Sequence, residues 1–166
     1  MYKRQDVIDL SGNSRCSEYV NAYLTENGIH TIDTLCLTKN AEQMYDTYGS
    51  ALRFIDVHEI ILPESTIIAE QANTPYDRWR LADRFSLDTN RYHVDWENEV
   101  LSISFDDLQI CVGTVLRELP EGTWNVVFCS QWKGEQEALI PNYIVEVEEY
   151  AEFRVKPDGT AFLREE

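Results

Sequence analysis

The spacing of apolar residues along the first part of the chain predicts alternating helices and strands. At 15–26 the apolar residues repeat every three or four positions, which is the period of an amphipathic helix. The β-branched and aliphatic residues of 29–37 and 52–62 predict two strands. A short helix is expected between them at 41–48, with Asn40 as its N-cap.

The middle of the chain is expected to contain two further helices and one hairpin. Thr74 reads as the N-cap of a helix that reaches at least Phe85, with a proline at its first position. Alternation over 91–105 predicts a hairpin that turns at Asn98. At 108–119 the apolar residues fall at helical spacing, which predicts the clearest helix of the chain.

The last third is expected to be β-rich, with strands at 124–129 and 143–147 and a final hairpin around Pro157-Asp158-Gly159. Separate helices and antiparallel hairpins are typical of an α+β fold. We therefore expect a single domain over residues 6–166, with an antiparallel sheet and about three to four helices.

The first five residues, Met1–Gln5, are interpreted as a non-native scar. The run Met-Tyr-Lys-Arg-Gln resembles the translation of a transposon end used to build sequencing libraries. On this interpretation the gene is metagenomic and the natural N-terminus is incomplete. One alternative for the whole chain is therefore an accessory domain cut from a larger protein.

Acidic residues dominate the charge of the chain and are concentrated in its second half. The chain has 30 Asp and Glu against 14 Lys and Arg, a formal net charge of -16. From Tyr92 to Phe153 we count 13 acidic and two basic residues, so this stretch carries -11 of the -16. Such a surface repels nucleic acid and anionic lipid, which are bound mainly through Lys and Arg. With no export signal and no apolar run of membrane length, we expect a cytoplasmic protein that binds neither.

The acid excess favours a protein that binds a basic surface on another protein. Carboxylates on a rigid scaffold can compete for the cationic channels of nucleic-acid-processing enzymes. In composition the chain resembles small acidic inhibitors of phages and mobile elements, including antirestriction and anti-CRISPR proteins. That resemblance implies a non-enzymatic nucleic-acid mimic without a cofactor. The residues expected to contact the partner are Glu135, Glu137, Glu146, Glu148, Glu149 and Trp132.

The alternative is a small hydrolase or metal-binding protein that uses His93 and Asp95. On a strand these two side chains point the same way, so the carboxylate can orient the imidazole or share a metal with it. A metal needs three or four ligands, and the other two histidines have no spacing that brings them in. We therefore favour the interpretation that His93 and Asp95 belong to the polar outer face of a hairpin. No nucleophile-elbow, P-loop or dinucleotide motif occurs.

Two other groups of residues have ordinary structural explanations. The four cysteines form no CxxC pair and lie among apolar residues, which predicts mostly buried thiols rather than disulfides. A catalytic role for Cys129 at a strand end is therefore not favoured. The arginines between Arg78 and Arg91 could hold a phosphate or an acidic peptide, but pairing with nearby acids is the favoured reading.

Overall fold

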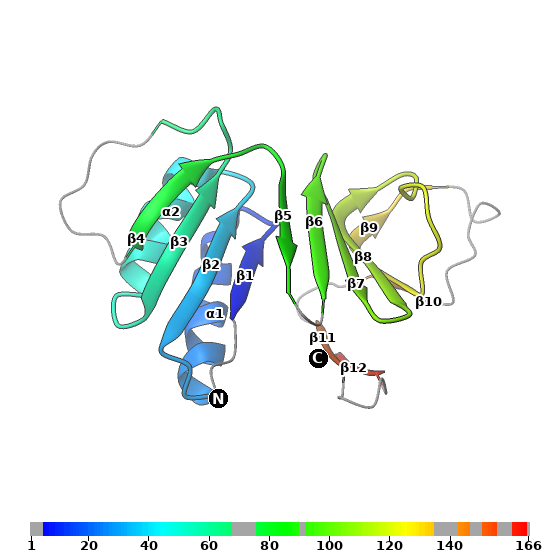
Figure 1. Cartoon of the computed structure of the whole chain (residues 1–166), viewed down its shortest axis with the longest axis horizontal. Helices are drawn as coiled ribbons and strands as arrows, with labels where there is room; N and C mark the ends of the chain where they lie inside the picture. Colours follow the sequence, from blue (N-terminus) through cyan, green and yellow to red (C-terminus); the bar gives the residue numbers. More distant parts are fainter. Residues whose placement is uncertain are drawn as a thin grey trace. The chain divides into compact units, whose positions relative to one another are not determined.

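Each half of the chain has its own sheet. The computed structural model describes residues 5–67, 76–89, 92–134, 143–146, 151–155 and 161–165. The chain divides into two units, Met1–Asp83 and Arg84–Glu166. Their elements are labelled in Figure 1. Met1–Arg4 of the proposed scar lie outside the described residues.

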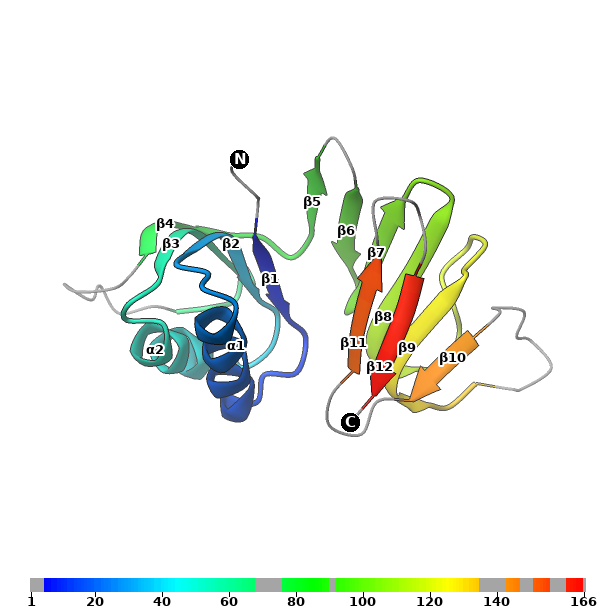
Figure 2. The same ribbon diagram turned by 90° about the horizontal axis from the view of Figure 1, so that it is seen from below.

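The first unit is a parallel α/β arrangement. Its four strands pair in chain order, β1-β2-β3-β4, and every pair is parallel. Both helices lie on one face of this sheet (Figure 2). The elements are β1 (Asp6–Asp9), α1 (Ser14–Glu26), β2 (Thr31–Leu37), α2 (Ala41–Ala51), β3 (Asp56–Leu62) and β4 (Tyr76–Leu81).

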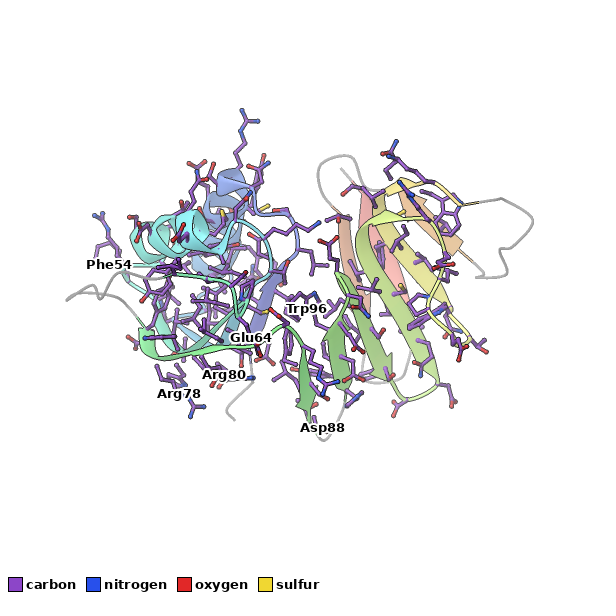
Figure 3. The ribbon with its side chains drawn as sticks, turned by 90° about the horizontal axis from the view of Figure 1, so that it is seen from above. Phe54, Glu64, Arg78, Arg80, Asp88 and Trp96 are labelled. Carbon is purple, nitrogen blue, oxygen red and sulfur yellow. The ribbon has the colours of Figure 1, made fainter. Side chains whose placement is uncertain are left out.

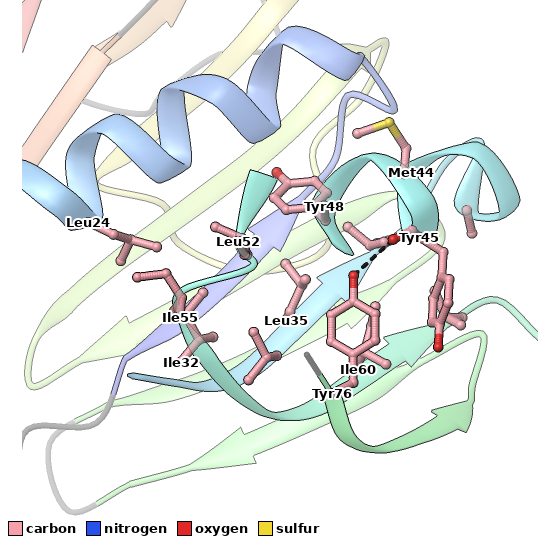
Figure 4. Packing of buried hydrophobic residues seen from close by; sticks show 14 residues of the cluster. Leu24, Ile32, Leu35, Met44, Tyr45, Tyr48, Leu52, Ile55, Ile60 and Tyr76 are labelled. Carbon is pink, nitrogen blue, oxygen red and sulfur yellow. Dashed lines mark hydrogen bonds between the residues drawn. The ribbon is translucent and has the colours of Figure 1, made fainter. Parts of the chain in front are cut away.

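The core of the first unit fills the space between the helices and the sheet (Figure 4). Tyr48 and Met44 of α2 are fully buried against Leu35 and Ile60 of the central strands. The hydroxyl of Tyr76 donates to the carbonyl oxygen of Tyr45 at 2.9 Å, so this buried phenol is satisfied. Because β2 and β3 are central strands, most of their apolar residues are removed from water.

Asn13 determines where α1 begins, and Gly28 and Ile29 determine where it ends. Asn13 is the N-cap, and its side-chain oxygen accepts from the Arg15 N–H at 3.0 Å. Gly28 has a φ of 63°, which glycine adopts without strain. The Gly28 N–H donates to Thr25 O, and the Ile29 N–H donates to Leu24 O. This pair of bonds is a Schellman motif, which satisfies the last carbonyl groups of the helix and turns the chain toward β2.

The second unit contains a mixed six-stranded sheet and a separate hairpin. The sheet order is β10-β9-β8-β7-β6-β5, in which β5 to β8 are antiparallel neighbours and β8, β9 and β10 run parallel. The hairpin pairs β11 with β12. The strands are β5 (Phe85–Asp88), β6 (His93–Glu97), β7 (Val100–Phe105), β8 (Leu108–Leu116), β9 (Val126–Trp132), β10 (Tyr143–Glu146), β11 (Ala151–Val155) and β12 (Ala161–Glu165).

The hairpin predicted at 91–105 is confirmed as β6 and β7. Its two-residue turn consists of Asn98 and Glu99, with φ of 52° and 66°. Positive φ at both positions is the geometry of a type I′ turn, whose twist matches the two strands. His93 pairs with Ser104 and Glu97 with Val100, so every second side chain of β6 shares one face.

The predicted fold class is wrong in its helices and in its sheet. The described residues contain two helices and twelve strands, where we expected three to four helices on an antiparallel sheet. The first sheet is entirely parallel, and the second is mixed. Where helices were expected at 75–85 and at 108–119, the structure has β4 and the start of β5 in the first range and β8 in the second.

A helix was wrongly predicted at 108–119 because β8, the strand in this segment, lies in the centre of its sheet. Ile110 and Cys111 are adjacent in sequence and both buried, so the strand lacks the clean alternation of a half-exposed one. Asp106, with a φ of 50°, forms a tight turn after β7. The Ser104 hydroxyl donates to Gln109 Oε1 at 2.7 Å across this turn.

Candidate functional site

The first candidate site lies where the parallel strands of the first unit end. β1, β2 and β3 run in the same direction, so the loops that follow them meet at one edge of the sheet. In parallel α/β sheets this carboxyl edge is the usual place for a ligand. The loops are residues 10–13, 38–40 and 63–67.

Asp9, the last residue of β1, organises this edge. Its side chain is 6% exposed. Oδ1 accepts from the Ser11 N–H at 2.8 Å, the Ser11 hydroxyl at 2.7 Å and the Gly12 N–H at 3.2 Å. Oδ2 accepts from the Tyr48 hydroxyl at 3.0 Å. Burial, and then the nearby Asp9 charge, raises the pKa of Tyr48, so this phenol remains a neutral donor.

Gly12 allows the loops after β1 and β2 to approach closely. Its φ is 62°, and a Cβ at this position would lie 2.8 Å from Lys39 Cβ. The Asn40 side-chain amide donates to Gly12 O at 3.0 Å and makes no capping bond to α2. Asn40 therefore stands at the predicted N-cap position but links two loops instead, so its side chain leaves the first-turn N–H groups of α2 uncapped.

A cavity of about 540 Å³ opens beside this loop pair. Its volume is in the range that small organic ligands occupy. The lining offers hydroxyl and amide groups and one carboxylate, with Pro63 and Ile67 as the main apolar contributors. The lining residues are Thr38, Asn40, Ala41, Glu42, Gln43, Pro63, Ser65, Thr66 and Ile67. The cavity lining therefore supplies mainly hydrogen-bonding groups.

The structure brings His93 and Asp95 together, as the sequence predicts, and adds Asp88 from the neighbouring strand. His93 Nδ1 lies 2.5 Å from Asp88 Oδ1, and Nε2 lies 2.5 Å from Asp95 Oδ2. Both ring nitrogens can donate at once only when the imidazole is protonated. The hydrogen bond to Asp88, and then the one to Asp95, raises the pKa of His93.

This geometry suits an imidazolium held by two carboxylates better than a metal. Each ring nitrogen of His93 faces a different carboxylate at hydrogen-bond distance. A zinc ion would lie about 2.0–2.2 Å from each of its nitrogen and oxygen ligands, which needs more room than these contacts leave. Within the described residues, no group of three or more His, Cys, Asp or Glu could hold a metal ion.

The same strands present an acidic face to solvent. Asp88 of β5 and Asp95 and Glu97 of β6 are exposed, and we call these three the acidic face. Ser86 and Ser102 flank Asp95 on the neighbouring strands, while Asp88 lies opposite His93 and Glu97 opposite Val100. The opposite face is apolar, with Trp96 stacked on Phe85 at a centroid distance of 5.7 Å. Figure 3 shows Asp88 and Trp96 on these neighbouring strands.

Most of the acids predicted to bind the partner lie outside the described residues, namely Glu135, Glu137, Glu148 and Glu149. Glu146 ends β10. Trp132 ends β9, is partly buried and packs against the small core of the second unit. The sequence predicted that Asp95 lies on the polar face of a hairpin, but the place of Asp88 opposite His93 could not be predicted, because it depends on the pairing of β5 with β6.

The four cysteines are thiols, in agreement with the sequence. Cys36, Cys111 and Cys129 are buried and Cys16 is partly buried. Burial raises the pKa of Cys36 to about 12 and that of Cys111 to about 11, so neither is a thiolate at neutral pH. Cys129 belongs to the small core of the second unit, which fits a packing role.

Two of the arginines singled out in the sequence share one acid. Arg78 Nε and Arg80 Nε lie 3.4 and 3.3 Å from the same oxygen, Glu59 Oε1. The expected pairing with nearby acids is therefore confirmed for these two. Arg84 is exposed, and Arg91 lies outside the described residues.

Comparison of the chain with family models, curated proteins and solved structures gives no match. The class of protein is thus defined by its own architecture, a parallel α/β unit followed by a mixed β unit. Among the described residues, no helix is long and apolar enough to span a membrane.

Proposed function

We propose that the protein binds a basic surface on another protein through its second unit and acts as an inhibitor of a nucleic-acid-processing enzyme. The observation that carries the proposal is the acidic face of β5 and β6. Its three carboxylates are exposed, and the described strands β5, β6 and β7 contain no Lys or Arg.

The strand geometry holds these carboxylates in a regular array. Asp95 and Glu97 are two residues apart on β6, which places them about 6.8 Å apart along the strand. Asp88 lies directly opposite His93 on the adjacent strand. When it is protonated, the imidazole cancels part of the charge but also fixes both neighbouring carboxylates in place. A fixed array loses less side-chain entropy on binding than free acids would.

Reversing the charge of this face is expected to abolish partner binding. The variant is Asp95→Lys with Glu97→Lys, which turns attraction to a cationic surface into repulsion. The protein is immobilised at low salt and exposed to a nuclease-treated bacterial lysate, and duplex DNA is then added as competitor. Proteins captured by the original chain should be released by the DNA and should not be captured by the variant.

A matched variant separates this effect from net charge. Glu18→Lys with Glu26→Lys changes the charge equally at exposed positions of α1 and should capture the same proteins. A third variant, Glu146→Lys with Glu148→Lys and Glu149→Lys, tests the acids chosen from sequence. Equal capture by all variants across a salt titration would refute a charged binding face in the second unit.

The cavity of the first unit supports a second candidate function, the binding of a polyhydroxylated small molecule. Its position at the carboxyl edge of a parallel sheet is the observation that favours it. A ligand present at a hundredfold excess over its Kd stabilises the folded state by about 2.7 kcal/mol. Adenosine and D-glucose serve as probes, and thermal unfolding reports the stabilisation.

Filling the cavity is expected to remove that stabilisation. Ser65→Trp places an indole among the lining residues, whereas Ser50→Trp adds the same group near the far end of α2. A probe that raises the Tm of the original chain should still raise that of Ser50→Trp and should leave Ser65→Trp unchanged. No shift with either probe, or equal shifts in both variants, would count against this function.

A further inference from the structure

The outer edge of β4 combines two exposed apolar side chains with two arginines. In the described part of the first unit, β4 stands at the end of the strand order and pairs only with β3. Trp79 is 53% exposed and Leu81 is 39% exposed. An edge strand also presents unpaired backbone N–H and C=O groups, which can pair with another chain.

Alternation over residues 78–81 of β4 sorts these side chains onto two faces. Arg78 and Arg80 pair with Glu59 of β3, and Trp79 and Leu81 belong to the opposite face. Figure 3 shows both arginines on the side of the sheet away from α2. The strand therefore offers a guanidinium row on one face and an apolar row on the other.

Among the described residues, the charge of the arginine row is only partly cancelled. One carboxylate, Glu59, lies between two guanidinium groups, and its side chain is 15% exposed. The side chain of Arg78 is 72% exposed and that of Arg80 is 42% exposed. In a chain of net charge -16, a pair of neighbouring solvent-facing arginines with one shared acid is a local cationic site.

Protection against aggregation does not explain the whole edge. Charged side chains on edge strands discourage unwanted pairing, and the two arginines alone would fit that role. An exposed tryptophan beside an exposed leucine has the opposite effect, because both gain free energy when they are covered. Tryptophan and arginine together are typical of residues that anchor a binding partner.

We propose that the outer edge of β4 binds an extended acidic segment of another protein, which adds to the sheet as a further strand. Main-chain hydrogen bonds to β4 hold the segment, as in other complexes formed by strand addition. Its alternate side chains are carboxylates that face Arg78 and Arg80 and apolar groups that cover Trp79 and Leu81. This surface is separate from the acidic face and selects the opposite charge.

The test uses an acetylated and amidated eight-residue peptide in which Glu and Val alternate. Binding to the full chain is expected to slow amide hydrogen exchange at 76–81. Arg78→Gln with Arg80→Gln keeps both side chains polar and should weaken binding about tenfold. Arg15→Gln with Arg53→Gln makes the same change at exposed positions elsewhere in the first unit and should bind as the original chain does.

Several results would overturn the proposal. One is unchanged exchange at 76–81 with the peptide at millimolar concentration, and another is equal weakening in the two double variants. A peptide of alternating Lys and Val that binds equally well would show that charge does not select the occupant. Protection of β4 that rises with protein concentration alone would identify a second copy of this chain as the occupant instead.

Discussion

Replacing Asp9 by alanine is expected to lower the free energy of unfolding by about 3 kcal/mol, because it removes a charged acceptor from four buried or partly buried donors. The donors are two backbone N–H groups and the hydroxyls of Ser11 and Tyr48. Tyr48 is fully buried, so its hydroxyl cannot turn to water once the carboxylate is gone. Urea denaturation followed by far-UV circular dichroism measures the loss.

Two further variants show whether the carboxylate itself is responsible. Tyr48→Phe removes one of the four bonds and leaves Asp9 with three donors, so it should cost only about 1–2 kcal/mol. Asp56→Ala makes the same truncation at an exposed position of β3 and should change stability by less than about 0.5 kcal/mol. Equal stability of Asp9→Ala and Asp56→Ala would show that the network contributes nothing.

The importance of Asp9 could not be read from the sequence, although its neighbours were suggestive. Asp9 ends the four-residue strand β1 and is followed by Ser11, Gly12 and Asn13, which are typical of a tight loop. The donor that completes the network, Tyr48, is 39 residues away. Its helical position was predicted, but only the parallel order of β1 and β2 places α2 over the end of β1.

Local sequence patterns were sufficient to predict the conformation of segments that are stabilised by their own turn or cap. The type I′ turn at Asn98 and Glu99 sets the register of β6 and β7, so the shared face of His93 and Asp95 could be predicted. Asp88 could not, since its place opposite His93 depends on the pairing of β5 with β6. That pairing was hidden by helix signals at 74–85.

Segments whose conformation depends on distant partners were assigned wrongly. Thr74 and Pro75, which precede β4 in the sequence, are good helix-start residues, but the pairing of β4 with β3 outweighs a local preference of a few tenths of a kcal/mol per residue. β8 lies between β7 and β9, so both of its edges are hydrogen-bonded. A central strand with apolar residues on both faces contains many three- and four-residue spacings, which imitate a helical stripe.

Trp124 is expected to be the most sensitive aromatic residue of the second unit. It is 9% exposed and packs with Cys111, Leu116 and Val127. Its indole N–H donates to Pro120 O at 3.0 Å, which ties the loop after β8 to the core. Trp124→Ala should therefore cost about 3–5 kcal/mol of unfolding free energy, measured by urea denaturation.

The matched substitutions divide this cost into packing and hydrogen bonding. Trp124→Phe keeps most of the apolar ring and loses the N–H donor, so it should lower the free energy of unfolding mainly by the value of one hydrogen bond, about 1 kcal/mol. The alanine variant should cost clearly more, because it also leaves a cavity. Trp79→Ala removes the same group from the exposed edge of β4 and should change stability by about 0.5 kcal/mol or less. If Trp79→Ala were as destabilising as Trp124→Ala, then Trp79 would be part of a packed core, and the open edge on which strand addition depends would not exist.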